Sequence, residues 1–180
     1  MTRFLFILLA ALGLPLSAVA QTGTMNSGAT STNSEPASSK LSMEDAHFIK
    51  MAAIGGLAEV NDGQLAVNKG NSSVKAIGTQ MVTDHSKANE QLSAIAKEDG
   101  MTPPTMVDAS HAATSAKLKT LSGAAFDREY LQTELVGHEE TIALFKAEAS
   151  SGSTENLKSF ASMTLPTLEQ HLSMIKSAMK

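Results

Sequence analysis

From residue 42 onward, hydrophobic residues recur every three or four positions, which is the period of an amphipathic helix. Ser42 is a suitable N-cap, and Asp45 three residues later completes a weak capping box. The apolar and small positions of the first stripe are Phe48, Met51, Ala52, Gly55, Ala58, Leu65 and Ala66. The segment "NKGNSS" interrupts the period at Gly70. The pattern therefore predicts a helix over residues 42–70.

A second stripe predicts a helix over residues 72–98. Its members are Val74, Ile77, Gly78, Met81, Leu92 and Ile95. The helix should end at "EDGMTPP", because Gly100 favours a C-terminal turn and Pro103-Pro104 cannot continue a helix.

The rest of the chain repeats this helical pattern. A short helix is predicted over 109–121, a long one over 124–150 and a last one over 154–179. Pro166 should kink the last helix or restart it locally. No alternating pattern long enough for a strand occurs. Four long helices with short loops inside each pair predict an all-α, antiparallel four-helix bundle, with an extra short helix in the long connection.

The two N-terminal segments read differently from the bundle. Residues 1–20, "MTRFLFILLAALGLPLSAVA", have a basic start, a short apolar run and an A-x-A site ending at Ala20. We interpret them as a signal peptide, too short in its apolar run to span a bilayer. Residues 21–40 are rich in Ser, Thr and Gly and predict a disordered linker. The folded domain should occupy 41–180, in the periplasm or secreted after cleavage near Ala20.

Composition narrows the choice of partners. The chain has no cysteine, which excludes disulfides and a cysteine-linked lipid anchor. Its formal charge is −4, and removal of Arg3 with the signal makes it one unit more negative. This balance argues against nucleic acid and anionic membrane surfaces as partners. No later segment is apolar enough to span a membrane. A metal ion, a second copy of the chain or an envelope protein remain as candidate partners.

Each long helix carries a polar residue on its apolar stripe. These residues are Glu59 in the first helix, His85 in the second, Glu134 and His138 in the third, and His171 in the fourth. Counting residues from the turns places them near the middle of the bundle. Imidazoles and carboxylates from facing helices are a typical metal-binding set. The alternative is a hydrogen-bonded polar core with no metal, and the sequence leaves both readings open.

A standard di-iron site is excluded. Such a site needs Glu-x-x-His pairs, and the residues three before the inward histidines are Val82, Leu135 and Leu168. The single Glu-x-x-His, from Glu44 to His47, falls at a helix start and reads as surface. What remains is one transition metal ion, namely iron, manganese, zinc or copper, or no metal.

Methionine and the catalytic motifs add little. Met81 and Met174 neighbour His85 and His171, and thioethers with imidazoles would suit copper(I), but methionine at helical spacing is more often core filler. The sequence has no G-x-S-x-G, no phosphate-binding glycine loop and no cysteine nucleophile. We therefore assign no catalytic residue, and an enzymatic activity is the less favoured reading.

The chain resembles the bacterial domain-of-unknown-function family 4142. The resemblance rests on four stretches in order and spacing, "FIKMAAIGGLAEVNDGQLA", "VKAIGTQMVTDHSKANEQLSAIA", "FDREYLQTELVGHEETIALF" and "LKSFASMTLPTLEQHL". It implies a ferritin-like bundle in an exported protein and implies no reaction. The polar residues characteristic of the family fall on Glu59, His85, Asp127, Tyr130, His138 and His171.

Two hypotheses about function follow. The leading one is an exported ferritin-like protein that binds a metal through its interior His and Glu residues, in metal handling or oxidative-stress defence. The alternative is an envelope or stress-related interaction protein without catalysis, whose interior polar residues are purely structural.

Overall fold

The computed structural model describes residues 41–180, which contain five helices and no strand. The helices are α1 (Met43–Lys69), α2 (Ser72–Glu98), α3 (Ala109–Thr120), α4 (Gly123–Ser151) and α5 (Glu155–Ala178). The predicted all-α class is confirmed, and each predicted helix boundary lies within one residue of the observed one. Of the kink or local restart predicted at Pro166, the restart does not occur, because α5 runs through Pro166 as one helix.

The two long helices nearest the start of the described chain begin at side-chain caps. Ser42 Oγ accepts a hydrogen bond from the Asp45 amide at 2.9 Å, and Asp45 Oδ2 accepts one from the Ser42 amide at 3.2 Å. This is the capping box predicted from the sequence. Asn71 Oδ1 caps α2 by accepting from the amides of Ser73 and Val74.

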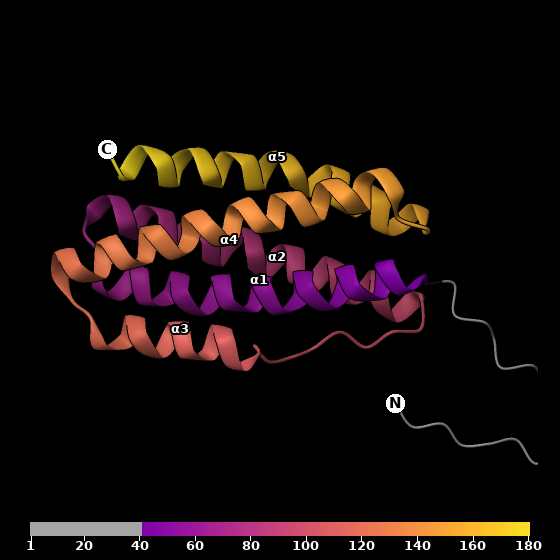
Figure 1. Cartoon of the computed structure of the whole chain (residues 1–180), viewed down its shortest axis with the longest axis horizontal. Helices are drawn as coiled ribbons and strands as arrows, with labels where there is room; N and C mark the ends of the chain where they lie inside the picture. The colour runs from indigo at the N-terminus through magenta and orange to yellow at the C-terminus, as the bar shows by residue number, and fades with distance from the viewer. Residues whose placement is uncertain (1–40) are drawn as a thin grey trace, which may run out of the picture. The chain divides into compact units, whose positions relative to one another are not determined.

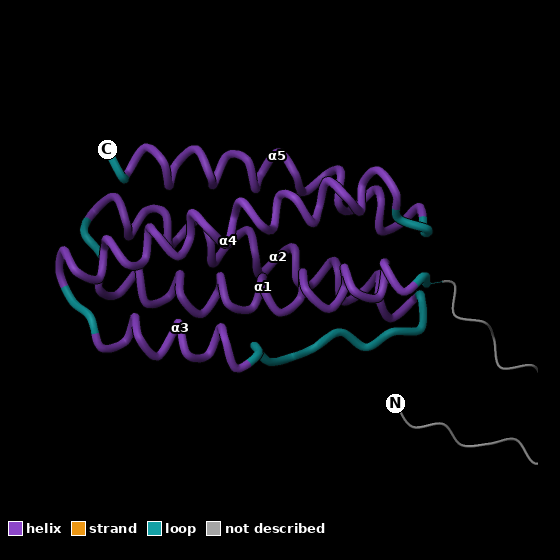
Figure 2. The backbone as a smooth tube through the Cα atoms, in the orientation of Figure 1, coloured by secondary structure: helices purple, strands orange, loops and turns teal. Residues whose placement is uncertain are grey.

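The long helices form two antiparallel hairpins, α1/α2 and α4/α5, which stack with α1 against α4 and α2 against α5. Neighbouring long helices run in opposite directions all the way round the bundle (Figure 1). The connection after α2 runs back along the bundle as an irregular segment and then forms α3, which lies along α1 (Figure 2). This connection leaves α4 to begin at the same end as α2.

Glycines allow the two helices of the first hairpin, α1 and α2, to pack closely. A Cβ atom on Gly78 of α2 would lie 2.6 Å from the carbonyl oxygen of Gly63 in α1, and 2.7 Å from Ala66 Cβ. Any side chain at Gly78 would force the backbones apart. The two glycines therefore set the close approach of α1 and α2.

The core consists of two apolar clusters separated by a polar layer. The first contains Phe48, Phe145 and Phe160, whose ring centroids lie 5.0–6.3 Å apart. The second contains Phe126 stacked on Tyr130, with centroids 5.9 Å apart. Along each long helix the order is one cluster, then one or two of the predicted site residues, then the other cluster. The polar residues thus occupy one level of the bundle.

Two sequence predictions concern other parts of the chain. The predicted signal peptide (1–20) and linker (21–40) lie outside the described residues. Within the described part, no helix has the length and apolar character that crossing a membrane requires.

Candidate metal centre

The structure brings all five predicted site residues together at the polar layer. His85 of α2, His138 of α4 and His171 of α5 place one ring nitrogen each within 4.8 Å of the others. Glu59 of α1 and Glu134 of α4 form a second such group with His138. The histidines are at most 7 % exposed. The three imidazoles therefore meet inside the bundle, away from solvent.

The hydrogen-bond partners of His138 indicate its tautomer. Its Nδ1 lies 3.0 Å from the carbonyl oxygen of Glu134. A carbonyl can only accept, so Nδ1 carries the hydrogen and donates it. In the neutral ring the other nitrogen, Nε2, then carries a lone pair. This nitrogen faces His171 Nδ1 at 3.4 Å.

His171 is held in the complementary form by a carboxylate. Its Nε2 lies 2.9 Å from Asp84 Oδ2, which also accepts from Gln80 Nε2 at 2.6 Å. Burial opposes ionisation of Asp84, but the hydrogen bonds from Gln80 and His171 outweigh it and lower its pKa. An ionised carboxylate accepts only, so Nε2 of His171 donates. The lone pair of this ring is on Nδ1.

Two nitrogen lone pairs consequently face each other inside the bundle. Like lone pairs repel, and the arrangement becomes favourable when a cation or a proton lies between them. Two nitrogens bound to one metal at about 2.0–2.1 Å with a tetrahedral angle lie about 3.3–3.4 Å apart. The observed separation of 3.4 Å matches that geometry.

His85 supplies a third nitrogen. Its Nε2 is buried and has no hydrogen-bond partner among the described residues. Burial lowers the pKa of His85 to about 4, although the nearby Glu59 carboxylate acts in the opposite direction. The ring is therefore neutral at pH 7, as a metal ligand must be.

The two glutamates lie on the other side of His138. Glu59 Oε1 is 3.5 Å and Glu134 Oε2 is 3.7 Å from His138 Nδ1. Burial and the adjacent Glu59 raise the pKa of Glu134 well above its usual value. Burial also opposes ionisation of Glu59, but its interactions with Glu134 and the histidines lower its pKa overall. The pair thus contributes one negative charge beside the imidazoles.

Asp84 and Gln80 are the site residues that sequence reasoning missed. Asp84 precedes His85, and adjacent helical residues point in different directions, which made a joint role with that histidine improbable. The partner of Asp84 is instead His171, in another helix. The four-residue spacing places Gln80 and Asp84 on one face of α2, and this was the available signal. The contact of Asp84 with His171 could be predicted only once the pairing of α2 with α5 was known.

The remaining polar residues characteristic of the family have other surroundings. Asp127 accepts hydrogen bonds from the backbone and side-chain nitrogens of Asn71, at 3.0 and 2.9 Å, and so joins the α1/α2 turn to α4. Tyr130 is fully buried, and its hydroxyl has no hydrogen-bond partner among the described residues. Neither residue belongs to the two groups of ligand atoms.

The other candidate ligands of the sequence lie in the apolar core or at the surface. Met81 lies in the second apolar cluster, and Met174 packs against it. Glu44 and His47 are exposed, as expected for a surface pair.

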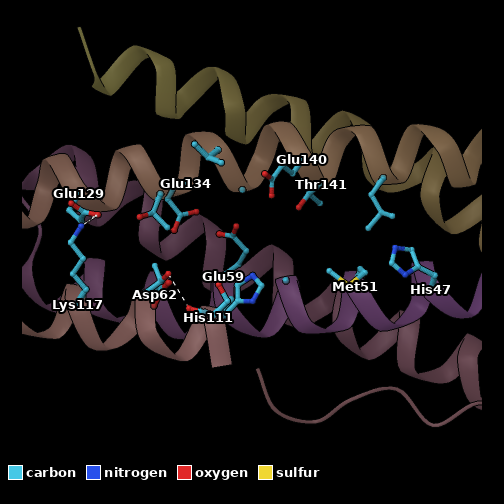
Figure 3. Close-up of a pocket in the computed structure, with 18 residues that line it drawn as sticks. His47, Met51, Glu59, Asp62, His111, Lys117, Glu129, Glu134, Glu140 and Thr141 are labelled. Carbon is cyan, nitrogen blue, oxygen red and sulfur yellow. Dashed lines mark hydrogen bonds and ion pairs between the residues drawn. The ribbon is translucent and has the colours of Figure 1, made fainter. Parts of the chain in front are cut away.

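A pocket of about 540 Å³ opens between α1, α3 and α4 beside the polar layer (Figure 3). Glu59 and Glu134 line it, and so does Asp62, whose carboxylate accepts a hydrogen bond from Ser115 of α3. Burial raises the pKa of Asp62, and the Ser115 hydrogen bond only partly offsets this. The side of the layer that contains Glu59 and Glu134 thus adjoins this pocket.

Comparison with known proteins identifies the family. The family described as "Domain of unknown function (DUF4142)" matches residues 30–178. The chain belongs to this family. A search of curated proteins gives no significant match. Among solved structures, the crystal structure of a DUF305 fragment from Deinococcus radiodurans is similar, with a TM-score of 0.67 at 13 % identity. The alignment covers 76 % of this chain and 95 % of that one, and it supports the bundle fold alone.

Proposed function

We propose that this DUF4142 protein binds one transition metal ion at the polar layer, with His85, His138 and His171 as ligands. The observation that carries the proposal is the approach of His138 Nε2 to His171 Nδ1 at 3.4 Å, at two nitrogens to which the other contacts of each ring assign lone pairs. Each ring is fixed by a hydrogen bond from its other nitrogen, one to a carbonyl and one to a carboxylate. Such outer partners are typical of metal-bound histidines.

The ligand set indicates the class of metal. Three neutral imidazoles suit zinc, copper, iron or nickel better than calcium or magnesium, which prefer oxygen ligands. Glu59 adds a negative charge close by, which favours a divalent cation over an empty cluster. Manganese stays among the candidates because of the two carboxyls, and sulfur ligation by Met81 or Met174 is not part of the proposal.

The biological role that we propose is metal handling or defence against oxidative stress outside the cytoplasm. Its support is the sequence pattern of residues 1–20 and the buried position of the site. An ion that is buried and bound by side chains from several helices is retained inside the protein and is not presented at its surface. We propose no catalytic reaction.

A metal-free polar core is the alternative. In that case one proton lies between His138 Nε2 and His171 Nδ1, and the protein acts as an interaction partner in the envelope. The 3.4 Å separation lies within reach of such a proton but is longer than the usual hydrogen-bond distance of about 2.7–3.2 Å. Metal content decides between the two.

The test is elemental analysis of protein purified without a His-tag and then incubated with Zn(II), Cu(II), Fe(II), Mn(II) or Co(II). We expect close to one metal per chain for at least one ion. The variants His85→Gln, His138→Gln and His171→Gln should lose it. His47→Gln is the matched control, because His47 is exposed and lies about three helical turns before Glu59 on α1. Protein that retains no metal, or that retains it equally in all four variants, contradicts the proposal.

A further inference from the structure

The pocket between α1, α3 and α4 is not needed to hold the histidines, yet it leads to them. Glu59 lines both this pocket and a small internal void that His85 also lines. The Glu59 side chain is 14 % exposed, whereas those of His138 and His171 are 1 % exposed. Glu59 therefore lies at the boundary between the pocket and the buried imidazoles.

Small residues keep Glu59 accessible from the pocket. A Cβ atom on Gly137 of α4 would lie 3.6 Å from Glu59 Oε1, and one on Gly55 of α1 would meet no atom within 4 Å. Both glycines line the pocket. A larger side chain at Gly137 would project toward the Glu59 carboxylate, and one at Gly55 would fill open space in the pocket.

The pocket is also suited to a cation by its charge. Its lining includes five carboxyl residues, Glu59, Asp62, Glu129, Glu134 and Glu140. Its lysine, Lys117, is paired with Glu129 at 2.6 Å. Glu134 Oε2 is buried, has no hydrogen-bond partner among the described residues and lies in the pocket wall (Figure 3). Because Lys117 offsets Glu129 and burial raises the pKa of Glu134, the excess negative charge of the pocket comes chiefly from Glu59 and Glu140. A cleft with an excess of one sign of charge concentrates counter-ions and accelerates their binding.

We propose that a divalent cation reaches the three histidines through this pocket, with Glu59 as the carboxylate that receives it first and Gly137 as the residue that keeps the passage open. This inference rests on the metal site proposed above and adds its route of loading. The hydrated ion exchanges bound waters for carboxylate oxygens and then for imidazole nitrogens. No bond within the protein is made or broken.

The opposite side of the bundle offers a poorer route. A pocket of about 250 Å³ between α2 and α5 is lined by Asp84 and Lys87 among others. Asp84 is already hydrogen-bonded to His171 and Gln80, and Lys87 places a positive charge near it. A cation is therefore less favoured there than in the larger acidic pocket.

The experiment is stopped-flow uptake of Co(II), followed by its absorption, in Gly137→Val. The valine is a better helix former than glycine, so α4 should stay intact. We expect uptake to slow by about ten-fold or more, with the amount of cobalt at equilibrium unchanged. Gly55→Val on the facing wall should slow uptake in the same way, and it replaces Gly137→Val if that variant loses helicity.

Two control variants test whether slower uptake requires a larger side chain in this particular pocket. Ala143→Val lies at an exposed position of α4 that does not line the pocket, and Thr167→Leu narrows the pocket between α2 and α5. Both should load at the wild-type rate. Equal rates for wild type and both glycine variants overturn the route and leave the metal site standing, as does slowing by Thr167→Leu alone. Absence of cobalt binding by the wild type overturns both proposals.

Discussion

The bundle buries ionisable groups at two levels. The two levels differ in the groups that lie next to each buried carboxyl. In the middle, the carboxyls of Glu59 and Glu134 lie beside imidazoles. At the end where α4 turns into α5, Glu148 lies beside the Asp45 carboxylate of the α1 capping box. Burial and this neighbouring acid raise the pKa of Glu148 to about 7.

The difference shows what each level is suited to do. The end pair contains two acids, so a proton shared with Glu148 is the simplest way to relieve it, and its effect is on stability. Asp45 has a structural task there, since it also accepts a hydrogen bond from the Ser153 amide at 2.8 Å. The middle layer contains bases with free lone pairs, so a cation can relieve it. Each contrast can be tested separately.

The largest expected effect is stabilisation of the middle layer by metal. At a free-ion concentration of roughly 1,000 times Kd, binding should add about 4 kcal/mol to the free energy of unfolding. In His138→Leu this gain should disappear, as measured by urea unfolding followed by circular dichroism. Metal-free His138→Leu should lie within about 1 kcal/mol of the metal-free wild type, because the facing lone pairs are removed. A purely structural histidine would instead cost about 1–3 kcal/mol without metal.

The second effect concerns the carboxylate behind the layer. Asp84→Asn should weaken metal binding by about 10–100-fold, because a neutral amide accepts the hydrogen bond from His171 Nε2 more weakly than the carboxylate does and no longer fixes the tautomer of this ring. Competition with a chromophoric chelator measures the affinity. Glu90→Gln, at an exposed position of the same helix, serves as the control and should leave affinity unchanged. Wild-type affinity in Asp84→Asn would show that this hydrogen bond does not organise the site.

The third effect belongs to the end pair and depends on pH. The folded pKa of Glu148, about 7, lies above the usual carboxyl value of 4.5, so the folded state keeps a proton that the unfolded chain has lost. Stability should therefore fall as pH rises from about 4.5 to 7, with the full cost above pH 7. Glu148→Gln should be more stable than wild type by about 1 kcal/mol at pH 8 and equal to it below pH 4.5.

Urea unfolding at several pH values checks this slope. The control is Glu140→Gln, an exposed glutamate of the same helix, which should keep the wild-type dependence. A Glu148→Gln variant that retains the slope between pH 4.5 and 7 would assign it to other groups.

The smallest expected effect is at Tyr130, where the middle layer meets the second apolar cluster. Tyr130→Phe removes a buried hydroxyl that has no hydrogen-bond partner among the described residues. The free energy of unfolding should change by less than about 0.5 kcal/mol, because no partner is left unpaired. Metal content should be unchanged. Loss of metal in this variant would extend the site by one residue and contradict the present boundary between layer and apolar cluster.

The interior position of the candidate site was predictable, whereas its hydrogen bonds were not. Glu59, His85 and His171 were recognised because they interrupt apolar stripes whose helices the sequence also delimits. That they bind a metal stays a prediction. The roles of Asp84 and Glu148 were not foreseen, because their partners, His171 and Asp45, lie in other helices. A stripe indicates which face is buried and says nothing about which helix covers it.

By itself, the sequence determined the five helices, their boundaries and the level at which polar residues enter the core. These features depend on contacts between residues three or four apart and on caps at the helix ends. The tertiary structure decided how the two hairpins stack, and with that which nitrogens face each other and which acids meet. Stacking depends on packing between side chains that are remote in sequence. The helical period shows which face of a helix is buried but does not show which residues of another helix lie opposite it. The facing pair of His138 and His171 exists only at that level.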